Sequence, residues 1–259
     1  MMKLLAPFLL ITGVMAAQEI NVAAAADLSS ALPELVAHYS QKTGQQVKLS
    51  FGASGNLTNQ IKNGAPFDAF FSADEEYPQQ LISEGLASKN TLYDYAVGRL
   101  VLWVPADSKL DVSTLGIKAL LNPSVKKIAI ANPATAPYGR AAQAALRHYG
   151  IYDQVSSKFV LGENVSQAAQ FVESGNSQAG IIALSHALAP TMKDKGRYWT
   201  VPLDAYPTLK QAAVVLSRSK HLDSARKFLE YLRTPEATSL LATYGFNLPK
   251  NTAQAEEHK

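Results

Sequence analysis

The chain has 259 residues, of which 47% are hydrophobic and 17% are charged, a composition that is typical of a folded globular protein and excludes a disordered one. Its 24 Lys and Arg residues outnumber its 21 Asp and Glu residues, and the resulting formal charge of +3 is small and evenly spread, which argues against a nucleic-acid-binding protein. The absence of cysteine excludes disulfides, thiol catalysis and cysteine-ligated metal centres.

Residues 1–17 have the layout of a secretory signal peptide. Lys3 precedes an apolar run from Leu4 to Met15, and the small residues Ala16 and Ala17 follow the run. The run is shorter than the about 20 residues that a transmembrane helix needs. We therefore expect cleavage near Ala16 and Ala17 and a mature protein that is exported to the periplasm as a soluble chain.

After this segment, short apolar runs alternate with amphipathic stretches along the chain. The runs predict strands and the stretches between them predict helices. This alternation favours an α/β fold with mainly parallel sheets that are covered on both faces, in one domain or in two lobes between which the chain crosses along strands. The expected strands are Ile20–Ala25, Val47–Phe51, Ala69–Phe71, Leu100–Val104, Lys127–Ala131, Gly180–Ala183 and Ala212–Leu216, and the expected helices are Leu32–Lys42, Leu57–Asn63, Tyr77–Glu84, Gly139–Tyr149, Val165–Ser174, Leu222–Arg233 and Glu236–Tyr244.

Ligands of open parallel sheets bind beyond the carboxyl ends of the strands, often at helix N-termini, and two such junctions lie in the first quarter of the chain. In the first, Pro33 belongs in the first turn of a helix, so the helix begins near Ser30 and the tight loop around Asp27 can turn its amides to a ligand. In the second, Gly52 and Gly55 allow an unusual turn around Ser54. Simple helix capping by Asp27, Ser30 or Ser54 is the alternative interpretation.

Two further junctions lie in the middle of the chain. Pro137 and Gly139 flank Tyr138 at the start of an Ala-rich helix, which places the Tyr138 amide at the positive end of the helix dipole. Asn164 is a good N-cap for a helix that begins at Val165. Both junctions offer backbone amides.

These junctions hold no catalytic machinery that the sequence reveals. Arg140 is their one basic side chain, the five histidines are scattered without metal-ligand spacing, and there is no Walker loop, carboxylate pair or Ser–His–Asp set. Amides, hydroxyls and helix dipoles can nevertheless hold an oxyanion without a charged partner. We therefore expect a binding protein and not an enzyme, with no cofactor, no directly ligated metal and a site that suits a fully deprotonated tetrahedral dianion. An exported hydrolase that uses Ser54 as its nucleophile is an alternative hypothesis, but the sequence shows no histidine partner for Ser54.

Eight segments in chain order resemble the periplasmic molybdate-binding proteins of bacterial ABC transporters, from about Glu19 to Pro249: INVAAAADL, FGASGNL, NGAPFDAFFSAD, YAVGRLVLW, IAIANPATAPYG, GENVSQA, GIIAL and YGFNLP. The resemblance implies a type II periplasmic-binding-protein fold, in which a two-strand hinge joins two α/β lobes around the ligand. It implies a first lobe of 18–97 with 216–249 and a second lobe of 98–215, which follow the signal peptide at 1–17 and precede the last ten residues, 250–259, whose composition indicates a polar tail.

The resemblance also implies a ligand and the residues that bind it. The ligand is molybdate or tungstate, delivered to a membrane permease by a monomeric receptor. Ser54 matches a serine that donates its hydroxyl and amide, and Tyr138 and Val165 match amide donors. Asp27 stands where some members have Ser or Asn, and Ala183 stands where some have a ligand-contacting Tyr.

The carboxylate of Asp27 is a departure from the family pattern, because it would repel a dianion. We expect its side chain to turn away and cap neighbouring amides, so that the Asp27 amide serves the ligand, with Ala26, Ser29 or Ser30 as further donors. Alternatively, the carboxylate accepts a hydrogen bond from a protonated oxyanion such as hydrogen phosphate, or from another small anionic solute.

Overall fold

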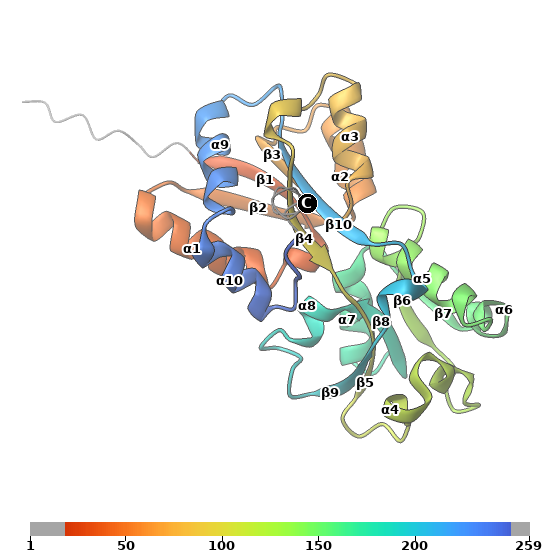
Figure 1. Cartoon of the computed structure of the whole chain (residues 1–259). Helices are drawn as coiled ribbons and strands as arrows, with labels where there is room; N and C mark the ends of the chain where they lie inside the picture. The colour runs from red at the N-terminus through yellow and green to blue at the C-terminus, as the bar shows by residue number, and fades with distance from the viewer. Residues whose placement is uncertain (1–18, 250–259) are drawn as a thin grey trace, which may run out of the picture.

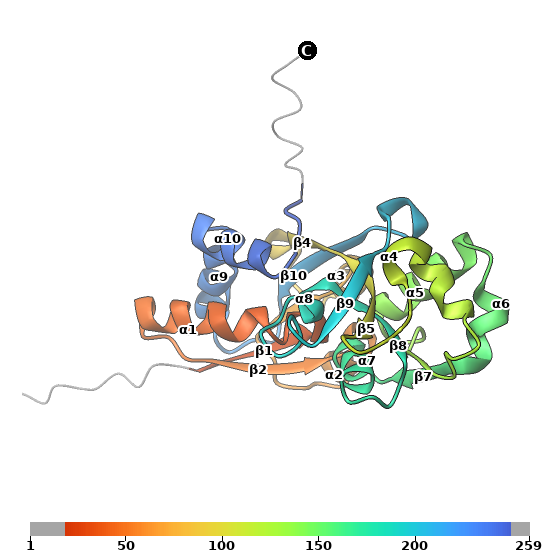
Figure 2. The ribbon, with the colours of Figure 1, turned by 90° about the horizontal axis from the view of Figure 1, so that it is seen from below.

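The computed structural model describes residues 19–249, so the predicted signal peptide and polar tail lie outside the described residues. Two five-stranded sheets form the cores of two lobes that lie side by side (Figures 1 and 2). The two-lobe α/β fold predicted from the sequence is confirmed. Each sheet is mixed, with two parallel and two antiparallel pairings.

The first lobe is built on the sheet β2-β1-β3-β10-β4. Its strands are β1 Ile20–Ala25, β2 Val47–Gly52, β3 Ala69–Ser72, β4 Tyr93–Gly98 and β10 Leu209–Val215. Its helices are α1 Ala31–Thr43, α2 Ser54–Lys62, α3 Glu76–Ser83, α9 Leu222–Tyr231 and α10 Pro235–Thr243, with the 3-10 turns η1 Ala26–Leu28 and η2 Lys89–Thr91.

Alternation along the strands divides the core of this lobe between the two faces of the sheet. Val22 and Phe71 belong to a buried cluster with side chains of α1, α9 and α10, whereas Ala23 and Phe70, their neighbours in sequence, pack against α2 and α3. The strands are therefore apolar on both faces, which is why they read as continuous hydrophobic runs in the sequence.

The second lobe repeats the plan with the sheet β7-β6-β8-β5-β9. Its strands are β5 Leu100–Pro105, β6 Ile128–Ala131, β7 Phe159–Gly162, β8 Ala179–Ala183 and β9 Gly196–Thr200. Its helices are α4 Val112–Leu115, α5 Pro137–His148, α6 Tyr152–Val155, α7 Val165–Glu173 and α8 Leu184–Ala187, with the 3-10 turns η3 Gly116–Leu121, η4 Ser156–Lys158 and η5 Leu203–Ala205.

The chain crosses between the lobes twice, from β4 to β5 and from β9 to β10 (Figure 1). The predicted division placed residues up to 215 in the second lobe. β10 instead pairs antiparallel with both β3 and β4, so its residues complete the first sheet and the crossing precedes Leu209. The two hinge strands β4 and β10 are antiparallel neighbours, so β4 leads into the second lobe and β10 returns from it.

The seven predicted strands and seven predicted helices are all present, with their ends shifted by up to three residues. The prediction missed β4, β7 and β9. Their sequences are YDYAVG, FVLG and GRYWT, which are too polar or too short to stand out as apolar runs. β7 and β9 are the edge strands of their sheet, so each pairs with a neighbouring strand on one side only, and its side chains need not all be apolar.

Candidate functional site

A small cleft lies between the two lobes, and the space between its walls, including the part that is open to solvent, is about 190 Å³. Five segments line it: the end of β1 with η1, the β2–α2 junction, the residue after β3, and the N-termini of α5 and α7. All four site residues predicted from the sequence, Asp27, Ser54, Tyr138 and Val165, line this cleft. Ser29, Ser30 and Ala183 do not.

Ser54 supplies a hydroxyl from the first lobe. It is the first residue of α2, after the extended N-cap Ala53, and its side chain is buried. Its Oγ accepts a hydrogen bond from the amide of Ala73 at 3.0 Å. Because that bond uses an oxygen lone pair, the hydroxyl proton remains for another acceptor, and the cleft is where an acceptor can enter.

Tyr138 and Val165 supply backbone amides from the second lobe. Pro137 and Val165 are the first residues of helices of 12 and 9 residues, so both positions lie in a first turn, where amides lack an acceptor within the helix. Asn164 caps α7 by accepting from the amide of Gln167 at 3.1 Å, as predicted. Two helix dipoles thus direct their positive ends toward the cleft.

Gly139 brings α5 close enough to the sheet for this arrangement. A Cβ at this position would lie 2.4 Å from the carbonyl oxygen of Ala131, the last residue of β6. A larger residue would push the N-terminus of α5 away from the strand end. Gly139 therefore allows the close approach between the start of α5 and the end of β6.

Asp27 lies in η1 and has no exposed surface. Its Oδ2 accepts a hydrogen bond from Nε2 of Gln211 at 2.5 Å, and the same Nε2 lies 3.3 Å from the hydroxyl oxygen of Tyr138, to which it also donates. Its Oδ1 is buried and has no hydrogen-bond partner among the described residues. The carboxyl group is thus held by the hinge strand β10, and not by the neighbouring amides that it was expected to cap.

Burial raises the pKa of Asp27 from 3.8 to about 6, although the hydrogen bond from Gln211, and the polar groups of Tyr138, Asp27 and Leu28 near the carboxyl group, oppose the shift. Burial, followed by the charge of Asp27, holds the pKa of Tyr138 well above its usual value. The phenol is therefore neutral, and its oxygen accepts from Nε2 of Gln211.

Gln211 and Tyr95, which the sequence analysis did not single out, complete a hydrogen-bonded interlobe network with Asp27 and Tyr138. The Tyr95 hydroxyl donates to Oε1 of Gln211 at 2.8 Å and lies 3.1 Å from the carbonyl oxygen of Ser72. The network joins the first lobe, both hinge strands and the second lobe. A buried glutamine at the start of the apolar run QAAVVL was the one local signal for it.

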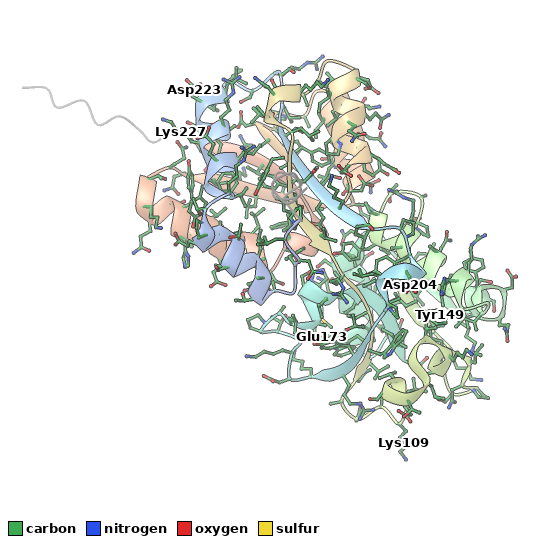
Figure 3. All side chains as sticks on the ribbon, in the orientation of Figure 1. Lys109, Tyr149, Glu173, Asp204, Asp223 and Lys227 are labelled. Carbon is green, nitrogen blue, oxygen red and sulfur yellow. The ribbon has the colours of Figure 1, made fainter. Side chains whose placement is uncertain are left out.

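The lobes also meet directly at the rim of the cleft. Nη2 of Arg140 in α5 contacts Oδ2 of Asp74 at 2.5 Å, a contact that we call the rim ion pair, and the Gly55 amide donates to the carbonyl oxygen of Thr135 at 2.9 Å. Arg140, the basic side chain nearest the predicted junctions, is therefore paired and does not line the cleft. Other charged side chains, such as Lys109, Asp223 and Lys227, lie on the outer surface (Figure 3).

Within residues 19–249, no group of three or more His, Asp or Glu side chains could hold a metal ion. No helix in the same range is long and apolar enough to cross a membrane. The residues that line the cleft offer backbone amides, the Ser54 hydroxyl and the buried carboxyl group of Asp27.

A family model of bacterial extracellular solute-binding proteins matches residues 20–247, and the chain belongs to this family, whose members are binding proteins and not enzymes. It is 37% identical to the molybdate-binding protein ModA of Azotobacter vinelandii over 90% of this chain and 91% of that protein. It is also 37% identical to ModA of Rhodobacter capsulatus over 89% of each chain.

Solved structures agree with this assignment. The periplasmic molybdate-binding protein of Azotobacter vinelandii superposes with a TM-score of 0.84 at 32% identity, over 89% of this chain and 100% of that one. The sulfate-binding protein SubI of Mycobacterium tuberculosis superposes with a TM-score of 0.69 at 19% identity, over 92% and 89% of the two chains, and it shares the fold.

Proposed function

We propose that this protein is an exported receptor that captures molybdate between its two lobes. The observation that carries the proposal is the convergence of the Ser54 hydroxyl and two helix N-termini on one cleft that no unpaired cation lines. The names of the two ModA relatives, each similar over about nine-tenths of the chain, support molybdate as the ligand.

In this proposal the oxygen atoms of the anion receive every contact and the metal is not ligated. Ser54 donates its hydroxyl and amide, and Asp27, Tyr138 and Val165 donate amides. Tungstate has nearly the same size and charge as molybdate, so the same donors would hold it. Sulfate is smaller, and a closed cleft would leave some donors out of its reach.

The remaining parts of the proposal concern the route of the anion. The receptor acts in the periplasm after removal of its signal peptide, as a monomer, and delivers the anion to the membrane permease of an ABC transporter. The periplasmic relative of known structure and the family assignment support this location.

Calorimetric titration of the purified mature protein with molybdate, tungstate, sulfate and phosphate tests the choice of ligand. We expect molybdate and tungstate to bind with similar affinity and sulfate and phosphate to bind at least about a hundredfold more weakly, the equivalent of about 2.7 kcal/mol. Equal or tighter binding of sulfate would contradict the proposal.

A second candidate keeps the fold and changes the ligand to a protonated oxyanion such as hydrogen phosphate, or to another small anionic solute. The unpartnered Oδ1 of Asp27 favours it, because an ionised carboxylate can accept a hydrogen bond from such a ligand. Tight binding of phosphate with weak binding of molybdate in the same titration would select this candidate.

A further inference from the structure

The two oxygen atoms of the Asp27 carboxyl group have different surroundings. Oδ2 is held by Gln211, whereas Oδ1 is buried without a partner, in a residue that lines the cleft. A buried polar atom without a partner is costly, and a buried charge without compensation is more so. The free protein is therefore incomplete at this atom, and a ligand in the cleft is available to complete it.

The hinge fixes which oxygen atom of Asp27 can carry a proton. The Tyr95 hydroxyl has one proton, and it donates this proton to Oε1 of Gln211 at 2.8 Å, which is the shorter of its contacts with Oε1 and with the Ser72 carbonyl at 3.1 Å. Oε1 therefore faces Tyr95, and the NH2 group of Gln211 faces Oδ2 of Asp27. Since Oδ2 already receives a donor, a proton on Asp27 belongs on Oδ1.

We propose that Asp27 binds the oxyanion as the neutral carboxylic acid, with Oδ1–H donating to an oxygen atom of the anion, so that each captured anion takes up one proton from solution. This inference rests on the proposed function of the cleft as an oxyanion site. As a neutral acid, Asp27 can donate a hydrogen bond, as a Ser or Asn side chain would at this position. Repulsion between a carboxylate and a dianion then does not arise.

The groups around Asp27 leave it as the residue that takes up the proton. Tyr138 and Tyr95 are buried phenols whose pKa values burial holds well above the usual value. His186 lies in α8, which packs against η1, and burial lowers its pKa to about 4, so it is neutral near pH 7. α7, which also packs against η1, carries no acidic or basic residue in its first turn.

The charged groups nearest the network are paired with each other. Asp74 at the rim contacts Arg140, and Lys210, beside Gln211 in β10, contacts Glu75 and Asp94. With a pKa of about 6, Asp27 is mostly ionised in the free protein at about pH 7.5, so binding converts most molecules from the ionised to the neutral form.

Titration calorimetry with molybdate, in several buffers of different ionisation enthalpy at about pH 7.5, measures the number of protons taken up. We expect close to one proton per anion for the wild-type protein, and an affinity that falls about tenfold for each pH unit above about pH 7. This measurement is made on the wild-type protein alone.

The variant Asp27→Asn keeps an acceptor for Gln211 and places an NH2 group at the position of Oδ1–H. We expect it to bind molybdate with no proton uptake and with an affinity that does not change between about pH 6 and pH 9. Asp68→Asn is the matched control, because Asp68 is a buried carboxylate in the same lobe that accepts from the Asn21 amide and Ser219, away from the cleft. It should keep the proton uptake of the wild type.

Two outcomes overturn the inference. If the wild type binds molybdate without proton uptake, Asp27 stays ionised and turned from the anion. If the uptake persists in Asp27→Asn, the proton resides on the anion. If the wild type binds no molybdate, the proposed ligand itself fails and the inference falls with it, a result that the titration separates from both of the others.

Discussion

Replacing Asp27 by Asn should change how the stability of the ligand-free protein depends on pH. Burial raises the pKa of Asp27 from 3.8 to about 6, so the folded protein holds this proton at pH values where the unfolded chain has lost it. The protonated acid therefore favours the folded state fully below about pH 3.8, and this contribution is lost as the pH rises through about 6. At 1.36 kcal/mol per pKa unit, the loss is about 3 kcal/mol.

The contribution of His186 to the free energy of unfolding has the opposite pH dependence, so in the wild type it offsets the contribution of Asp27. Burial lowers its pKa from 6.5 to about 4, so its contribution to stability is present above about pH 6.5 and is lost as the pH falls through about 4, again by about 3 kcal/mol. The comparison must therefore be between two proteins at each pH, because the contribution of His186 cancels in the difference.

Urea denaturation without any oxyanion, followed by tryptophan fluorescence, measures that difference. We expect the free energy of unfolding of Asp27→Asn, minus that of the wild type, to be about 2.4 kcal/mol larger at about pH 7.5 than at about pH 4, where part of the full contribution is already lost. A difference that stays constant with pH would refute the reasoning, because it would mean that Asp27 titrates alike in the folded and unfolded chain.

Three other substitutions test the site and the contacts between the lobes. Ser54→Ala should weaken molybdate binding by roughly 1.5–3 kcal/mol in calorimetry, whereas Ser177→Ala, which removes a buried hydroxyl without a partner in the second lobe, should leave binding unchanged; equal affinities would make Ser54 purely structural. Arg140→Ala breaks the partly exposed rim ion pair and should increase the rate of anion release several-fold in stopped-flow measurements, which corresponds to about 1 kcal/mol. The control Arg147→Ala, on the same helix, should leave this rate unchanged. Gly98→Ala would place a Cβ 2.3 Å from the Tyr138 hydroxyl of the interlobe network. It should lower the free energy of unfolding, measured by urea denaturation, by about 1–3 kcal/mol. An unchanged free energy of unfolding would show that the hinge adjusts freely.

The sequence was sufficient to predict the loops of the site because their signals are local. Gly139, Asn164 and the glycines around Ser54 each mark a helix start within a few residues, and the structure brings these starts together. The interlobe network could not be predicted from the sequence because its members are far apart along the chain. Gln211 and Asp27 are 184 residues apart, and Gln211 and Tyr95 are 116 residues apart.

The same limit explains two other differences from the predicted fold, the sheet to which β10 belongs and the mixed sheets where mainly parallel ones were expected. An apolar run predicts a strand but does not say which sheet the strand joins, so β10 was placed with the second lobe although it pairs with β3 and β4. The antiparallel pairings of β5 and β10 arise from the two crossings between the lobes, which are long-range features.

The central claim is that neutral donors from both lobes hold molybdate in the cleft. Crystals grown with molybdate, measured at an X-ray energy where molybdenum scatters anomalously, test it most directly. We predict one strong anomalous peak between Ser54 and the N-termini of α5 and α7, with the oxygen atoms of the anion in contact with the amides of Tyr138 and Val165. A peak elsewhere, or a cleft without one in crystals soaked to saturation, would contradict the account.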